Sequence, residues 1–92
     1  MPKLIGFAFT EDALNYLERI PHKLRHQVIK KAKALHLSPR PQGTKLLKGV
    51  FTPEGERVYR ERSGDYRILY VVRDNPSEVI ILDIDHRKDI YR

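Results

Sequence analysis

The first third of the chain carries apolar residues at helical spacing. Ala13, Leu14 and Leu17 form the apolar stripe of one predicted helix. That helix begins after Thr10, because a hydroxyl side chain followed by acidic residues is a typical helix start. It ends at Ile20–Pro21, because a residue before proline avoids the helical region.

A second helix is predicted from Pro21–His22 to Ser38–Pro39. Its apolar positions recur at three- and four-residue intervals, at Leu24, Val28, Ala32 and Leu35. Two amphipathic helices joined by a proline break predict an antiparallel helical hairpin.

The second half of the chain has the two-residue period of strands. Strands are predicted at Val58–Ser63 and Tyr66–Val72, around a tight turn at Gly64–Asp65. A third strand, Glu78–Asp85, is rich in valine and isoleucine. At the other end of the chain, Leu4–Phe9 is short and apolar and also predicts a strand.

Lys45–Gly49, which precedes the hairpin, is interpreted as a short turn that tucks two leucines inward. The predicted order is therefore β-α-α-β-β-β in one domain, residues 1–92. This order is typical of an α+β fold in which an N-terminal helical hairpin packs on a mostly antiparallel sheet.

A two-residue turn at Gly64–Asp65 fixes the register of the hairpin. Arg62 then lies directly opposite Arg67, while Tyr66, Ile68 and Tyr70 face the helices. Like charges across a strand pair destabilise by a few tenths to ~1 kcal/mol, so something is expected to neutralise them. A phosphate-rich ligand is one candidate, because guanidinium groups bind phosphate bidentately.

The alternative is an ordinary solvated sheet face with Arg–Asp pairs. In the last strand Ile80, Leu82 and Ile84 are expected to face the helices, which would place Asp83 and Asp85 beside the arginines.

Composition favours an anionic partner. The 92 residues hold 18 Lys and Arg against 12 Asp and Glu, for a net charge of +6. Nucleic acid, an acidic protein and a membrane surface all fit that charge. The longest apolar run, Ile68–Val72, is far shorter than the ~20 residues that span a bilayer. We expect a cytoplasmic protein with no membrane association.

Metal and cofactor chemistry finds little support in the sequence. There is no cysteine, which excludes disulfides and thiolate metal sites. His22 and His26 are four residues apart but lack a third ligand at suitable spacing. No glycine-rich phosphate loop is present. We expect neither a metal nor a cofactor.

The tail after the last predicted strand is polar. His86 has a side chain that titrates near neutrality, Arg87 adds positive charge, and Tyr91 offers a ring for stacking on a base.

These residues resemble the RelE/ParE toxin superfamily, the small toxins of bacterial and archaeal toxin–antitoxin pairs. The likeness covers nearly the whole chain and runs in order through Ala13–Leu17, Ile20–Arg25, Ser38–Pro41, Lys45–Gly49, Tyr59–Arg60, Ser63–Tyr70 and His86–Tyr91.

The resemblance implies a ribosome-dependent endoribonuclease. RelE-like members enter the vacant decoding site of the 70S ribosome and cut the messenger RNA there without a metal. The messenger's own 2′-hydroxyl attacks the adjacent phosphate. A cognate antitoxin protein binds the toxin and blocks it.

The resemblance also suggests roles for individual residues. Arg67 matches the hairpin arginine that stabilises the phosphate, and Arg60 matches a basic residue on the preceding strand. Arg87 and Tyr91 match the arginine and tyrosine after the last strand, and His86 is the candidate for proton transfer. We further expect Arg62, Lys45 and Lys48 to contact RNA.

One position departs from the family pattern. Val58 stands where some RelE proteins have another lysine, so one proton-transfer candidate is missing. Two alternatives therefore stay open: a ParE-type toxin that inhibits DNA gyrase by binding, and a non-catalytic relative of the same fold.

Overall fold

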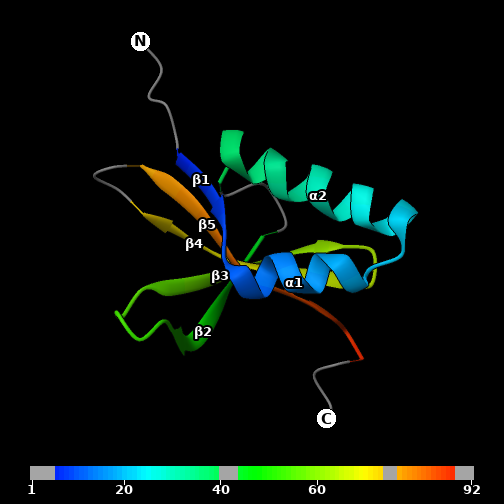
Figure 1. Cartoon of the computed structure of the whole chain (residues 1–92). Coiled ribbons are helices and arrows are strands. Elements are labelled where there is room, and N and C mark those ends of the chain that lie inside the picture. The colour runs from blue at the N-terminus through cyan, green and yellow to red at the C-terminus, as the bar shows by residue number, and fades with distance from the viewer. Residues whose placement is uncertain (1–5, 40–43, 74–76, 89–92) are drawn as a thin grey trace.

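A five-stranded mixed sheet carries two helices on one face (Figure 1). The computed structural model describes residues 6–39, 44–73 and 77–88. The elements in chain order are β1 (Gly6–Phe9), α1 (Glu11–Arg19), α2 (His22–Leu37), β2 (Lys45–Phe51), β3 (Arg57–Ser63), β4 (Tyr66–Arg73) and β5 (Glu78–His86).

The strand order is β1-β5-β4-β3-β2. β1 pairs with β5 in parallel, and the other three pairs are antiparallel. The chain reverses direction between α1 and α2, which both lie over the sheet (Figure 1). The α+β fold with a helical hairpin on a mostly antiparallel sheet is thus confirmed. Of the predicted first strand, Leu4 and Ile5 lie outside the described residues.

The helix boundaries follow from local hydrogen bonds. The Thr10 hydroxyl accepts a hydrogen bond from the Ala13 amide at 3.2 Å and donates to the Leu82 carbonyl, so it both caps α1 and joins it to β5. The end of α1 is tied to α2 by Arg25, whose Nη2 donates to the carbonyls of Glu18 and Ile20 at 3.0 and 3.1 Å.

The core lies between the helices and the sheet. Its helical members are Ala13, Leu17, Ile20, Val28, Ala32 and Leu35, and its strand members are Ile68, Tyr70, Val79, Ile81 and Ile84. Tyr70 is fully buried, and its hydroxyl donates to the Pro39 carbonyl at 2.7 Å. The predicted faces of the hairpin are correct, because Ile68 and Tyr70 pack under the helices.

The expected facing of β5 is correct only in part. Ile84 lies opposite Ile68, but Tyr70 lies opposite Ile81, so Leu82 is an extra residue on β5. This bulge reverses the alternation. Val79 and Ile81 therefore join the core together with Ile84, in place of Ile80 and Leu82.

The interpretation of Lys45–Gly49 as a short turn is wrong. These residues belong to β2, an additional strand that pairs with β3 at the edge of the sheet. Leu46 is exposed, so the leucines are not both tucked inward. Gly49 has a φ of 74°, and the register shifts between Leu46 and Phe51. That irregularity removes the simple alternation that would have indicated a strand.

Candidate phosphate-binding site

The β3–β4 turn brings the predicted arginines together. Gly64 has a φ of 60°, a conformation that L side chains rarely adopt, so glycine suits the tight turn. The register places Arg62 directly opposite Arg67. The predicted like-charge pair is therefore confirmed.

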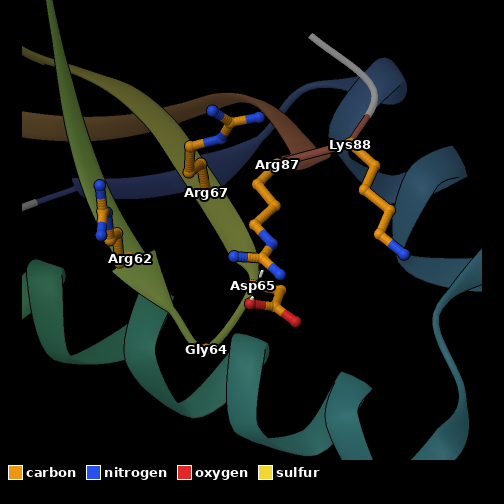
Figure 2. Close-up of a pocket in the computed structure, with 6 residues that line it drawn as sticks. All are labelled: Arg62, Gly64, Asp65, Arg67, Arg87 and Lys88. Carbon is orange, nitrogen blue, oxygen red and sulfur yellow. Dashed lines mark ion pairs between the residues drawn. The ribbon is translucent and has the colours of Figure 1, made fainter. Parts of the chain in front are cut away.

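A hollow of about 460 Å³ opens beside this turn (Figure 2). We call it the basic hollow, and its lining residues are Arg62, Gly64, Asp65, Arg67, Arg87 and Lys88. Among the described residues, four cations from two separate chain segments meet there, against one lining carboxylate. Such a surface favours a small, strongly anionic group such as a phosphodiester.

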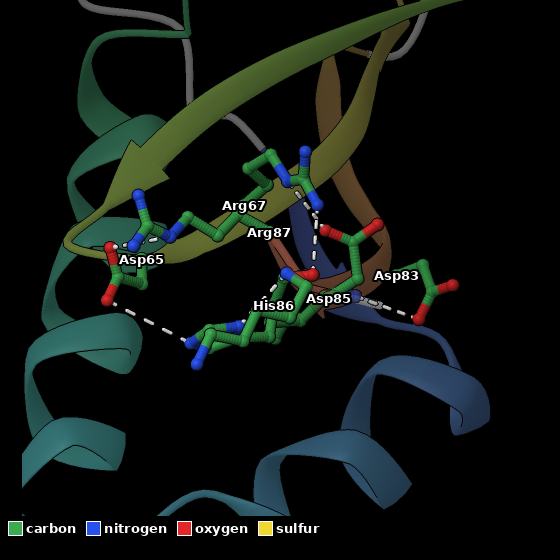
Figure 3. Close-up of polar contacts among 8 residues, drawn as sticks. Asp65, Arg67, Asp83, Asp85, His86 and Arg87 are labelled. Atoms are coloured by element: carbon green, nitrogen blue, oxygen red, sulfur yellow. Dashed lines mark hydrogen bonds and ion pairs between the residues drawn. The ribbon is translucent and has the colours of Figure 1, made fainter. Parts of the chain in front are cut away.

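Arg67 is fixed by the fold on the side of the sheet away from the helices. Its Nε donates to Asp85 Oδ1 at 2.9 Å, and its Nη2 donates to the His86 carbonyl at 2.9 Å (Figure 3). Only 8% of Arg67 is exposed. These two bonds use two of the five guanidinium N–H groups, so donors remain for a ligand in the hollow. The expected Arg–Asp pairing thus occurs here, and it orients the arginine.

Arg87 is exposed, in contrast to Arg67. Its Nε lies 3.4 Å from Asp65 Oδ1, and 65% of its side chain is accessible. Its backbone amide donates to the Asp65 carbonyl at 2.9 Å, which anchors the segment after β5 to the turn. An exposed ion pair contributes little free energy. A phosphate can therefore replace Asp65 as the partner of Arg87 at small cost.

His86 lies on the helix side of the sheet. It pairs with Tyr66 across the strands, with ring centroids 5.1 Å apart. Its ring lines a separate hollow of about 240 Å³, with Tyr66, Asp65 and Leu24 among the other lining residues. Asp65 connects the two hollows, because its Oδ2 lies 3.9 Å from His86 Nε2 while its Oδ1 faces Arg87 (Figure 3).

The tautomer of neutral His86 follows from its hydrogen bond to the backbone. The Lys88 amide donates to His86 Nδ1 at 3.1 Å, so this nitrogen accepts. The proton of the neutral ring is then on Nε2, the atom that faces Asp65.

Asp83 does not pair with an arginine among the described residues, although Asp85 does. Its carboxylate accepts a hydrogen bond from the Ile84 amide at 2.8 Å. Burial raises the pKa of Asp83, and the neighbouring charges of Asp85 and Asp12 raise this pKa further, while the bond from Ile84 opposes them.

The remaining predicted residues lie outside the basic hollow. Arg60 is half-buried on β3, two residues before Arg62, with Lys45 of β2 opposite it. Lys45 and Lys48 are both exposed on the edge strand, and Lys45, paired with Arg60, extends the positive face away from the turn. Tyr91 lies outside the described residues.

Two charged lining residues, and Gly64 of the turn, were not predicted as site residues. Lys88 follows Arg87, and Asp65 is the second residue of the turn. Asp65 lies in the turn between the paired arginines, and Lys88 follows the predicted site residue Arg87; these neighbours were the signal that could have found them. The structure also brings His22 and His26 together, with ring centroids 4.7 Å apart. Within residues 6–39, 44–73 and 77–88, no three His, Asp or Glu side chains are grouped to hold a metal ion.

The fold and the hollow define a small basic α+β protein with an arginine-lined hollow at one end of a strand hairpin. The family described as ParE toxin of type II toxin–antitoxin system, parDE, matches residues 7–91. The chain belongs to this family of toxins, within the RelE/ParE superfamily.

The toxin RelG of Mycobacterium tuberculosis is 34% identical over 85 residues, which cover 91% of this chain and 92% of RelG. The RelBE2 toxin–antitoxin complex of the same organism contains a chain with 28% identity and a TM-score of 0.72, and the match covers 90% of this chain and 98% of that one.

The fold is also that of more distant relatives. A chain of the archaeal RelE–RelB complex from Pyrococcus horikoshii has a TM-score of 0.75 at 23% identity, over 91% of this chain and 96% of that one. A chain of the E. coli RelBE complex has a TM-score of 0.69 at 27% identity, over 89% of this chain and 95% of that one. Among the described residues, no helix has the length and apolar character needed to cross a membrane.

Proposed function

We propose that this toxin is an endoribonuclease that cuts messenger RNA in the vacant decoding site of the ribosome. The observation that carries the proposal is the meeting of Arg62, Arg67 and Arg87 in one hollow. The likeness to RelG and to the toxin of RelBE2 supports a RelE-type activity. The whole chain acts as one toxin domain in the cytoplasm, where its target lies.

The proposed reaction is an internal transfer at a phosphodiester. The 2′-hydroxyl oxygen of one nucleotide forms a bond to the adjacent phosphorus, and the bond to the 5′-oxygen of the next nucleotide breaks. The products are a 2′,3′-cyclic phosphate and a free 5′-hydroxyl. The 2′-hydroxyl gives its proton to solvent water, and one proton is given to the departing 5′-oxygen, so that the step balances.

The arginines stabilise the charge that builds up on the phosphate. Arg67 is already oriented by Asp85 and by the His86 carbonyl, so it loses little freedom when the phosphate arrives. Arg87 exchanges Asp65 for the phosphate. Removal of one such donor typically lowers the rate by about 10²–10³-fold.

His86 supplies the proton for the leaving 5′-oxygen. This role requires the imidazolium form of the ring, because a neutral imidazole is too weak an acid to protonate the leaving oxygen. The donated proton leaves from Nε2, which lies 3.9 Å from Asp65 Oδ2. Arg60, which lies two residues before Arg62 on β3, assists through its positive charge. Tyr91 stacks on the messenger and orients it. Placement by the ribosome contributes to the alignment of the attacking oxygen.

The test uses ribosomes stalled with an empty decoding site, and the messenger ends are mapped by primer extension. We expect a cut within the vacant codon. Arg87→Ala should lower the cutting rate by about 10²-fold or more, and Tyr91→Phe should weaken cutting strongly. Arg57→Ala is the matched control, because Arg57 is an exposed arginine of β3 outside the basic hollow. Its rate should not change.

Inhibition of DNA gyrase is the second candidate function, because the matching family is described as ParE toxin. Uncut messenger together with trapped gyrase–DNA complexes would replace the first proposal with this one. Uncut messenger without such complexes would instead favour a non-catalytic relative.

We also propose a small cognate antitoxin as the resting partner of this toxin. The RelE structures with RelB are complexes of this kind. The net charge of +6 favours a partner with an acidic toxin-binding segment. Co-expression of the toxin with the small protein encoded beside it should give a complex that restores growth. Growth arrest that persists despite co-expression would contradict this pairing.

A further inference from the structure

A second basic depression lies next to the basic hollow, between α2 and the end of β3. We call it the α2 groove. It has a volume of about 370 Å³, and its cations are Lys30 and Lys31 of α2 and Arg62 of β3. No carboxylate is among its lining residues within the described part of the chain. Its positive charge is therefore not neutralised by its own walls.

The α2 groove is continuous with the basic hollow. Arg62 and Gly64 line both depressions. The tip of the turn at Gly64 lies against α2, with Arg62 on one side of it and Arg87 on the other (Figure 2). A chain of phosphates that occupies the basic hollow can therefore pass over Arg62 to reach the two lysines.

The lining of the α2 groove fits a sugar–phosphate backbone. Gln27 and Ser63 add neutral donors and acceptors, and Ala34 is the one apolar side chain among the described lining residues. None of these residues offers an aromatic ring, so stacking of bases would not contribute to binding there. A protein segment would need apolar anchors, which these residues do not provide.

We propose that the α2 groove is a second contact for RNA, which holds the backbone of the single strand a few nucleotides away from the phosphate in the basic hollow. The inference rests on the proposed function, since it extends the same RNA beyond that site. It assigns Lys30 and Lys31 to binding and gives them no part in the chemical step.

The test measures how affinity depends on RNA length. Single-stranded 2′-O-methyl oligoribonucleotides of about 4, 8 and 12 nucleotides are bound to the purified toxin by fluorescence anisotropy at several salt concentrations. Affinity should rise with length in the unaltered toxin. The double variant Lys30→Gln, Lys31→Gln should lose that rise, and its salt slope for the longest RNA should fall by about 1.4.

The matched control is the double variant Lys23→Gln, Lys33→Gln. It removes the same charge from exposed positions of the same helix, outside the α2 groove. It should keep the length dependence. Equal losses in the two double variants would overturn the proposal, because they would show a mere effect of net charge. An absence of length dependence in the unaltered toxin would also overturn it.

Two further results separate this inference from its alternatives. If the Lys30 and Lys31 variant keeps its RNA binding but loses binding to a poly-glutamate peptide, the groove serves an acidic protein and the RNA assignment is wrong. If the length dependence holds but stalled ribosomes keep their messenger intact, the second contact stands and the proposed cleavage fails.

Discussion

The guanidinium group of Arg67 has two roles. It makes hydrogen bonds that fix it within the fold, and it lines the hollow in which the ligand is proposed to bind. Its bonds to Asp85 and to the His86 carbonyl need a planar fork with donors at fixed angles. The strand register places Arg67 directly opposite Arg62, and the repulsion between the two charges lowers the stability of the fold. The ion pair of Arg67 with Asp85 offsets part of this cost. The fold therefore keeps a repulsive charge pair that a bound phosphate would relieve.

Arg67→Lys should impair both stability and the proposed cleavage. Lysine keeps the charge but cannot make both bonds in the same geometry, and a lost partner costs about 1–3 kcal/mol at a buried site. We expect a lower denaturation midpoint and a cutting rate reduced by about 10²-fold, measured on stalled ribosomes. An Arg67→Lys variant that cuts as fast as the unaltered toxin would remove the guanidinium from the proposed mechanism.

Asp83→Asn should stabilise the toxin at neutral pH. Burial raises the folded-state pKa of Asp83 above its ordinary value of 3.8, so the native state holds this proton more tightly than the unfolded state. Ionisation of Asp83 therefore costs stability at high pH. Asparagine removes the charge and can still accept the Ile84 amide bond.

The pH dependence gives the check on Asp83. The stability difference between the variant and the unaltered toxin should be greatest at neutral pH. It should shrink as the pH falls through the raised folded-state pKa of Asp83, and it should be lost below 3.8, where both states of the unaltered protein carry the proton. Urea denaturation at a series of pH values measures it. A variant that is less stable at neutral pH would contradict the assigned burial cost.

At the scale of elements, the β3–β4 turn positions the basic hollow. Gly64 adopts a φ of 60°, and a Cβ atom at this position would meet no atom within 4 Å outside its chain neighbours. A substitution there acts through backbone strain alone.

Gly64→Ala should lower stability by about 1–2 kcal/mol, the cost of a left-handed conformation for an ordinary residue. Thermal denaturation should show a lower midpoint. Gly64→Asn is the control, because asparagine tolerates this conformation better and should lose less. Equal losses for alanine and asparagine would argue against backbone strain as the cause.

The side chain of Arg25 connects α1 and α2 by hydrogen bonds, in addition to the backbone that links them. Arg25 of α2 donates to two carbonyls at the end of α1. Arg25→Ala should leave these carbonyls without that partner and cost about 1–2 kcal/mol. Arg19→Ala, which alters an exposed arginine of the last turn of α1, should change urea denaturation much less. Similar losses for both variants would contradict the role of Arg25.

At the scale of the whole molecule, the features that depend on local pattern were predictable from the sequence. Thr10 and Pro21 marked the helix boundaries, and the turn at Gly64–Asp65 determined the register that opposes Arg62 to Arg67. The bulge at Leu82 was not predictable, because it depends on how β5 meets its partner strand. The strand β2 was missed because Gly49 interrupts its alternation.

The candidate site was predicted in part for the same reason. Arg62, Arg67 and Arg87 follow from register and from position at the strand end, and they meet in one hollow. His86 lies two residues after Ile84, so the alternation predicted for the last strand places it on the helix side of the sheet, where it is found. Its hydrogen bond from Lys88 depends on the local backbone and fixes its tautomer.

The most direct measurement of the proposed reaction replaces a single 2′-hydroxyl by hydrogen in the vacant codon of a stalled ribosome. The attacking group is then missing at one phosphate while every other contact is retained. We predict that cutting at that phosphate is abolished, and that the unaltered messenger yields a 2′,3′-cyclic phosphate and a free 5′-hydroxyl. Continued cutting at the 2′-deoxy position would contradict the proposed reaction.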